Sequence, residues 1–300
     1  MSFETILTDR PQPHTYRIRL NRPERRNAQN FSMLYEIDAA IKEACEDSEI
    51  SVIILGAEGP DFSAGHDLAF SDDHNPGPYD RHGLWAGFRE PGAEGFYSIE
   101  KESYLDLTER WRNCPKPTIA QVQGRVIAGG NMLVWACDLI VAAQNASFQD
   151  NTIDMGMPGA EFFNHPYEMP IRLAKEFLFT AEVVDAAEAH RRGMVNHVVE
   201  LEALEAETLK LAARIAEKPL FALKQAKEAM NKAQDQMGRP HAMAHSFAQH
   251  QLAHMHNVLM HNFPIDFSRL HPKMQEAIRA YIKESGGDPF GFRPKQEAAE

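Results

Sequence analysis

The chain has 300 residues and a mass of 33.9 kDa, enough to bury one large hydrophobic core. Hydrophobic residues make up 43% and charged residues 25%, which excludes wholesale disorder and fibrous proteins. The 31 basic residues against 43 acidic ones give a net charge of -12. So acidic a chain is a poor general binder of nucleic acid or of an anionic membrane surface.

Cysteine usage and the N-terminus indicate a cytoplasmic protein. Cys45, Cys114 and Cys137 are widely spaced and fit neither a disulfide framework nor a zinc motif. The first five residues are acidic and no apolar stretch follows them, so we expect no signal peptide. The most apolar window, 132–143, is interrupted by Asp138 and is too short to span a membrane.

The first two thirds of the chain alternate between strand and helix patterns. In 15–20, Tyr16, Ile18 and Leu20 share one face, which predicts a half-buried strand, and 51–55 is a short apolar run typical of a buried one. Further strands are predicted at 118–127, 139–143 and 195–199. Helices are predicted at 32–47, 100–112, 132–136, 169–180, 186–192 and 201–217.

From Pro219 onward the patterns are helical, at 220–233, 242–260 and 273–283. We therefore expect an α/β body over 1–217 and an all-helical region over 218–300. One segment, 69–114, is rich in glycine, proline and aromatic residues, and its first half has no periodicity. It is either a lid or substrate pocket, or an insertion packed on the surface.

Two glycine turns are the first chemical signal. In 124–131 the glycine spacing begins like a P-loop, but the lysine and hydroxyl residue that bind phosphate are missing, and no strand leads into a Rossmann fingerprint. What remains is a strand that enters Gly129-Gly130 and an apolar helix, whose first amides are unpaired. A similar turn lies at Gly65. Two such amides converging on one oxygen form an oxyanion hole.

The sequence resembles the crotonase superfamily, the relatives of enoyl-CoA hydratase and isomerase. Four motifs match in order, and the resemblance covers about residues 3 to 233. They are Asn-Arg-Pro-x-x-x-Asn-Ala (21–28), Ala-Gly-x-Asp-Leu (64–68), the stretch from Pro-Lys-Pro-Thr-Ile-Ala through Gly-Gly to Cys-Asp (115–138), and Ala-x-x-x-Gly-Met-Val-Asn (189–196).

The resemblance implies a spiral of ββα units with a helical C-terminal region that packs on neighbouring subunits, as a trimer or a dimer of trimers. It implies an acyl-CoA substrate and no further cofactor or metal. The oxyanion amides map to His66 and Gly129. Arginines after the first strand suit the CoA phosphates, and the motif around the first oxyanion turn would also contact the CoA substrate. The positions nominated for CoA are Arg25, Arg26, Ala64, His66, Asp67 and Leu68.

The chain departs from the two-glutamate hydratases of that family. Met132 stands where one glutamate is expected, and Asn151 or Thr152 where the other is, so hydration by two glutamates does not carry over. Glu161 is the first candidate for acid/base work, just inside a possible helix start, with His165 four residues later. Asp150 and Asp154 are the other candidates.

The expected function is enolate-type chemistry on a CoA thioester, by default hydratase- or isomerase-like. A C–C bond hydrolase or thioesterase is the alternative, and a non-catalytic binding homologue is a third possibility. Seven of the fourteen histidines lie in the tail. Without a His-Glu-x-x-His pattern or a nearby cysteine, we expect His241, His245, His250 and His254 to lie on a solvated or interface helix rather than at zinc.

Overall fold

The computed structural model describes residues 3–68, 77–88 and 90–288. Its main sheet has six strands in the order β1-β2-β3-β4-β6-β9. The β1–β2 pair is antiparallel and the other pairs are parallel. The strands are β1 (Ile6–Asp9), β2 (Thr15–Leu20), β3 (Val52–Ala57), β4 (Thr118–Val122), β6 (Leu139–Ala143) and β9 (His197–Val199).

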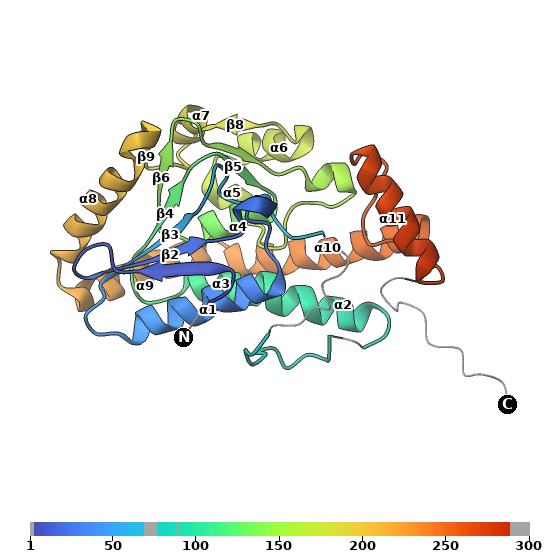
Figure 1. Ribbon diagram of the computed structural model, residues 1–300, viewed down its shortest axis with the longest axis horizontal. Coiled ribbons are helices and arrows are strands. Elements are labelled where there is room, and N and C mark those ends of the chain that lie inside the picture. The colour runs from blue at the N-terminus through green and yellow to red at the C-terminus, as the bar shows by residue number, and fades with distance from the viewer. Residues whose placement is uncertain (1–2, 69–76, 89, 289–300) are drawn as a thin grey trace.

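Both faces of this sheet are buried, because alternate residues of its central strands point to opposite sides. Ile53 and Leu55 face the main core, beneath helices α1 (Phe31–Glu46) and α4 (Gly129–Trp135). Val52 and Ile54 face a smaller cluster completed by α8 (Leu204–Ala216), which flanks the sheet in Figure 1. The strand predicted at 51–55 is apolar along its whole length because its two faces pack into two different cores.

A second sheet of three strands, in the order β5-β7-β8, carries the part of the chain that leads into the candidate site. Its strands are β5 (Arg125–Ile127), β7 (Ser147–Gln149) and β8 (Val184–Asp185). The single strand predicted at 118–127 is wrong. It is two strands, β4 and β5, in different sheets, because Gly124 at a φ of 60° turns the chain between them.

Helices surround the sheets in Figure 1, and α10 runs along the molecule beneath them. The sequence places most helices correctly to within a few residues, but the helix of the 69–114 segment begins at Ala93 and includes a π-helical turn. Beside α1, α4 and α8, the helices are α2 (Ala93–Glu100), the π-helix η2 (Lys101–Asp106), α3 (Leu107–Arg112), α5 (His165–Glu168), α6 (Ile171–Thr180), α7 (Ala186–Arg191), α9 (Leu220–Gln236), α10 (Arg239–His261) and α11 (Pro272–Glu284), with short 3-10 turns η1 (Pro23–Arg25), η3 (Thr152–Met155) and η4 (Leu201–Ala203).

The sequence patterns miss the short strands β1, β7 and β8. Strands of two to four residues are too short to show a period of two, so only tertiary contacts define them. Beyond Pro219 the described residues are helical apart from short turns, as predicted. No helix in the described part of the chain is long and apolar enough to cross a membrane.

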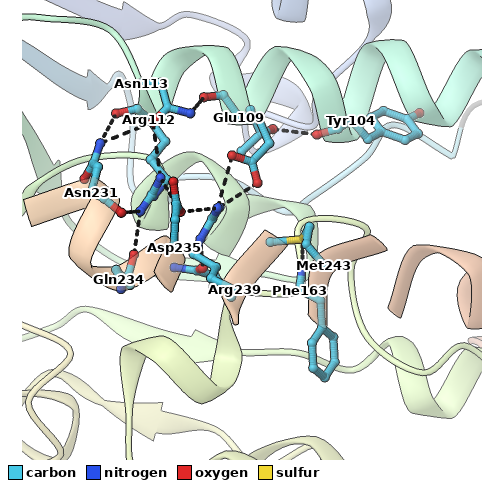
Figure 2. Close-up of polar contacts among 12 residues, drawn as sticks. Tyr104, Glu109, Arg112, Asn113, Phe163, Asn231, Gln234, Asp235, Arg239 and Met243 are labelled. Atoms are coloured by element: carbon cyan, nitrogen blue, oxygen red, sulfur yellow. Dashed lines mark hydrogen bonds and ion pairs between the residues drawn. The ribbon is translucent and has the colours of Figure 1, made fainter. Parts of the chain in front are cut away.

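The C-terminal helices are fixed to the body by a buried arginine, Arg239, at the start of α10 (Figure 2). Only 1% of its side chain is exposed, and its guanidinium lies 2.7 Å from Glu109 of α3 and 3.5 Å from Asp235 of α9. It also donates to the side-chain oxygen of Asn164 at 2.9 Å. One planar cation with several donors thus joins three segments far apart in the sequence and sets where α10 begins.

Replacing Arg239 by Met should lower the free energy of unfolding by about 3 kcal/mol, because Glu109 is then left without its cation and the Asn164 side-chain oxygen without its donor, whereas Asp235 keeps Arg112. Thermal unfolding of the purified variant measures the effect. Arg191→Met is the matched control, since Arg191 is 71% exposed and its pair with Glu188 lies on the surface. That change should leave the thermal midpoint almost unchanged, because an exposed pair is screened by solvent. Equal losses in the two variants would contradict the anchoring role.

Candidate active site

The first predicted oxyanion turn is built around Gly65, whose φ is 88°. Its carbonyl accepts the Gln29 amide at 2.8 Å, and its own amide donates to the Ser63 hydroxyl at 3.2 Å. A Cβ at residue 65 would lie 2.8 Å from the Ile127 carbonyl oxygen and 3.2 Å from the Gly129 nitrogen. Only glycine permits both the left-handed backbone and this close approach. The two glycine turns are therefore direct neighbours in space.

The second turn precedes α4. Ala128 has a φ of 47°, and its amide donates to the Gln149 carbonyl at 2.9 Å, which fixes the chain before the helix begins at Gly129. Among the described residues, no hydrogen bond uses the amide of His66 or of Gly129. The predicted pair of unpaired donors is therefore present, on turns that lie against each other.

The imidazole of His66 lies over Gly129 and connects this pair to a carboxylate. A Cβ at residue 129 would lie 2.6 Å from the His66 ring, so the position has no room for a side chain. His66 Nε2 is 3.0 Å from Glu161 Oε2, and their side chains are 16% and 6% exposed. Burial alone would raise the pKa of Glu161, but the facing His66 and His250 bring it well below its ordinary value.

Beyond Glu161 lie two histidines of α10 that were predicted to lie on a solvated or interface helix. That prediction is wrong for two histidines of α10, since His250 and His254 are only 3% and 4% exposed. His250 Nε2 is 3.4 Å from Glu161 Oε1, and His254 Nε2 is 2.9 Å from Glu100 Oε1. Burial lowers the pKa of His250, but Glu161 and Glu100 outweigh it and raise the value to about 9. His241 and His245 are exposed.

The described part of the 69–114 segment contributes directly to this region. The Tyr104 ring, on the π-helix η2, stacks on the imidazole of His66 with centroids 3.8 Å apart. On α2, Glu100 reaches the α10 histidines. A π-helical turn changes the direction of successive side chains, and such turns are frequent at functional sites. The second half of the segment is therefore a packed helix that lines the candidate site, whereas 69–76 and 89 lie outside the described residues.

Asp150 and His165, two of the nominated catalytic residues, form a separate buried pair. His165 Nε2 lies 2.8 Å from Asp150 Oδ2, and both side chains are fully buried. Asp150 also accepts from Thr152 and, at 3.2 Å, from the Ala160 amide. Burial by itself would raise the pKa of Asp150, but His165 and Thr152 lower it. The pair holds the chain immediately before Glu161 in place.

The relation expected between Glu161 and His165 is therefore wrong. No helix starts at Glu161. The helix α5 begins at His165, after a non-helical stretch, and His165 contacts Asp150 rather than Glu161. The chain turns at Gly159, whose φ is 135°, and the Asn164 amide then donates to the Phe162 carbonyl at 2.8 Å, which closes a local turn before the helix begins.

Asp154 lies away from these groups, 3.7 Å from Arg269 of the tail and 43% exposed. Met132 is buried in α4, and the Thr152 hydroxyl donates to Asp150 at 2.6 Å. The first position that holds a glutamate in the hydratases of the resemblance thus holds a thioether, and the second holds the amide of Asn151 or the hydroxyl of Thr152. Neither supplies a carboxylate to the site.

The residues nominated for CoA surround the Gly65 turn. Arg25 and Arg26 are exposed, and the Arg26 carbonyl accepts the Ala64 amide at 2.9 Å. Asp67 pairs with Arg22 at 2.8 Å, and Leu68 is 39% exposed. The basic segment is therefore attached directly to the oxyanion turn, with its guanidinium groups accessible to a phosphate.

Four side chains of this region were not nominated from the sequence: Glu100, Tyr104, His250 and His254. A signal existed for the two histidines. In α10 the buried residues include Met243, Phe247, His250 and His254, at spacings of four, three and four. The histidines thus continue the stripe begun by two apolar residues, which marks the face toward the core. For Glu100 and Tyr104 no apolar spacing in the sequence indicated that their side chains point toward the core.

Comparison with known proteins identifies the family to which the chain belongs. A family model described as enoyl-CoA hydratase/isomerase matches residues 13–259. A putative enoyl-CoA hydratase, EchA13 of Mycobacterium tuberculosis, is 44% identical over 245 residues, 80% of this chain and 77% of that protein. The crystal structure of a probable enoyl-CoA hydratase from Mycobacterium smegmatis is 43% identical with a TM-score of 0.78, over 87% of this chain and 98% of that one.

An enoyl-CoA hydratase/isomerase from Xanthobacter autotrophicus Py2 is 27% identical with a TM-score of 0.75, and the match covers 99% of this chain and all of that one. The α/β spiral and the helical C-terminal region thus occur together in a solved structure, which confirms the predicted fold class. The chain belongs to the enoyl-CoA hydratase/isomerase family, that is, to the crotonase superfamily. The family match extends to residue 259, beyond the last motif seen in the sequence.

Asp150→Asn should destabilise the fold, because the new amide group faces donors and leaves at least one buried N–H without an acceptor. The expected loss is about 1–3 kcal/mol, seen as a fall of several degrees in the thermal midpoint. Asp154→Asn is the matched control and should change stability by less than about 0.5 kcal/mol. A stable but inactive Asp150→Asn variant would instead favour a direct role of Asp150 in catalysis.

Proposed function

We propose that the protein is an acyl-CoA enzyme that stabilises an enolate or a related oxyanion formed at the thioester carbonyl. The observation that carries the proposal is the pair of unpaired amides, His66 and Gly129, on two touching turns. Donors held ready for a developing negative charge contribute roughly 3–4 kcal/mol each to transition-state stabilisation. The family supports a CoA thioester as the substrate, with CoA part of the substrate rather than a separate cofactor.

The proton is moved by the His66–Glu161 pair. His66 is the more exposed of the two and lies next to the amides, so its imidazole is the group that meets the substrate. Glu161 accepts the Nε2 proton at 3.0 Å and thereby leaves Nδ1 as the lone pair. Nδ1 is buried and has no hydrogen-bond partner among the described residues, so it is available to a substrate group that enters the site. A carboxylate that fixes the tautomer and stabilises the imidazolium serves the same purpose in unrelated catalytic triads.

The CoA nucleotide binds along the basic segment after β2, where Arg25 and Arg26 are exposed beside the Gly65 turn. The expected assembly is a trimer or a dimer of trimers in the cytoplasm. It is supported by large apolar side chains exposed on α6, α9 and α10, which a neighbouring subunit would cover. They include Phe179, Phe221, Met230, Leu252 and Leu259, each at least 62% exposed.

The first test is a panel of acyl-CoA thioesters with detection of products by mass. Hydration of crotonyl-CoA should be absent or at least about a hundred-fold slower than in a two-glutamate hydratase assayed beside it, because neither Met132 nor Thr152 carries a carboxylate. Another acyl-CoA should be converted with its thioester intact. Hydration at the comparison enzyme's rate would contradict the assignment of the site, and release of free CoA would indicate a thioesterase.

The second test separates binding from proton transfer at residue 66. His66→Gln removes the imidazole and keeps the backbone amide, so an enolisable ligand such as acetoacetyl-CoA should still bind. Turnover should fall about 10²–10⁴-fold. Glu161→Gln should behave in the same way, since the amide keeps the shape of the side chain and loses its charge. Calorimetry measures binding, and the substrate found in the panel measures turnover.

Asp154→Asn, remote from these groups, is the control for the second test and should keep near-normal turnover. Full turnover in both the His66 and the Glu161 variant would remove the pair from the mechanism. Loss of ligand binding in a folded His66→Gln variant would show that the imidazole binds substrate rather than moving a proton.

A further inference from the structure

Three buried side chains gather next to Glu161 of the candidate active site, and none of them is assigned to proton transfer. Glu100 of α2 and His250 and His254 of α10 each place one ligand-type atom within 4.8 Å of the others. Glu100 is 4% exposed, and the two histidines are 3% and 4% exposed. The two histidines are four residues apart, one above the other on a single helix face. The cluster is thus formed by two elements that are more than 140 positions apart in the sequence.

The hydrogen bonds of both histidines fix which nitrogen faces the cluster. His250 Nδ1 is 2.8 Å from the Gly159 carbonyl oxygen, and His254 Nδ1 is 2.6 Å from that of Pro264. A carbonyl oxygen only accepts, so each Nδ1 carries a proton. In the neutral imidazole each Nε2 then carries a lone pair that is free to bind a cation. Metal-binding histidines have this arrangement, with the second nitrogen donating to a backbone carbonyl.

The two Nε2 atoms point into the cluster without a hydrogen bond. Both are buried and neither has a partner in hydrogen-bonding geometry among the described residues, although Glu100 Oε1 lies 2.9 Å from His254 Nε2. A lone pair that faces a carboxylate at this distance is stable only with a cation between the two atoms, either a proton or a metal ion. The buried carboxylates of Glu100 and Glu161, 3.7 and 3.4 Å from His250 Nε2, give the cluster the negative charge that a divalent ion neutralises.

The donor set selects the kind of ion. Two imidazole nitrogens and one carboxylate oxygen suit zinc and its transition-metal neighbours, whereas magnesium and calcium prefer oxygen alone. Ligands at about 2.0–2.2 Å from a tetrahedral ion are about 3.4 Å apart. His254 Nε2 is 2.9 Å from Glu100 Oε1 and His250 Nε2 is 3.7 Å from Oε2, so the carboxylate lies beside both imidazoles at distances near that value. Glu161 Oε1, 3.4 Å from His250 Nε2, is within reach as a fourth ligand.

We propose that Glu100, His250 and His254 form a binding site for a divalent transition-metal ion, zinc in the first place. The ion joins the helix of the 69–114 segment to α10 and holds both against the Glu161 turn. The Gln251 amide, which donates to the second oxygen of Glu100, orients that carboxylate. The site shares Glu161 as a neighbour with the reaction proposed above, but zinc binding is measured without any substrate.

The experiment uses the full chain without a polyhistidine tag, stripped with EDTA and dialysed into metal-free buffer. Zinc is titrated in, its stoichiometry is measured by mass spectrometry of the metal, and cobalt(II) serves as the optical probe. We expect one tightly bound zinc per chain, visible cobalt bands of a site with fewer than six ligands, and a higher thermal midpoint with zinc. Glu100→Gln and His254→Gln should each weaken zinc binding at least about a hundred-fold.

The matched control is the double variant His241→Gln/His245→Gln, an exposed pair with the same spacing on the same helix. It should bind zinc as the unaltered chain does. No stoichiometric zinc in the unaltered chain would overturn the proposal, as would unaltered binding in folded Glu100 and His254 variants or loss of binding in the control. Circular dichroism reports folding, and if a variant fails to fold, the stoichiometry and the cobalt spectrum of the unaltered chain decide. None of these readouts requires a substrate, so a negative result leaves the proposed reaction standing.

Discussion

The placement of the candidate site depends on one buried carboxylate, that of Glu161, lying between two imidazoles. A charge removed from water costs several kcal/mol unless it is compensated, so Glu161 is stable only with His66 on one side and His250 on the other. His66 belongs to the Gly65 turn and His250 to α10. This one requirement therefore fixes the distance between the oxyanion turn and the C-terminal helices.

The anchoring at the far end of α10 serves the same geometry. Arg239 begins that helix, and its ion pairs with Glu109 and Asp235 set the helix position about three turns before His250. On the opposite side, the Asp150–His165 pair holds the amide of Ala160, the residue before Glu161. Polar groups that make no contact with the oxyanion amides thus determine where the charged groups lie.

Residues whose role follows from local backbone chemistry were predictable from the sequence. The turn at Gly65 needs glycine because its φ is 88°, and this requirement shows in its motif. Gly129 stands in a matching motif as well, but the absence of its side chain is required by the distant His66 ring. The helices of the tail were equally visible, because their apolar period extends over several turns. A prediction of this kind succeeds when the cause lies within about ten residues.

The predictions that failed concern features whose cause lies far away in the sequence. Gly124 turns the chain between β4 and β5, but the sheet that each strand joins is decided by distant partners. The inward direction of Glu100 and the burial of His254 likewise result from contacts across long sequence separations. Histidine is compatible with a solvated face and with a buried polar cluster, so residue type alone does not separate the two. Only the apolar neighbours Met243 and Phe247 on the same stripe of α10 carried that information.

The order of these elements along the chain has a consequence for synthesis on the ribosome. The oxyanion turns and Glu161 lie in the first 161 residues, whereas His250 and His254 emerge more than eighty residues later. Until α10 has left the ribosome, Glu161 is without one of its two imidazoles and Glu100 is without both. Before that point, Glu100 and Glu161 lack these histidine partners. Both carboxylates are paired and buried as in the finished fold only when α10 packs against the body.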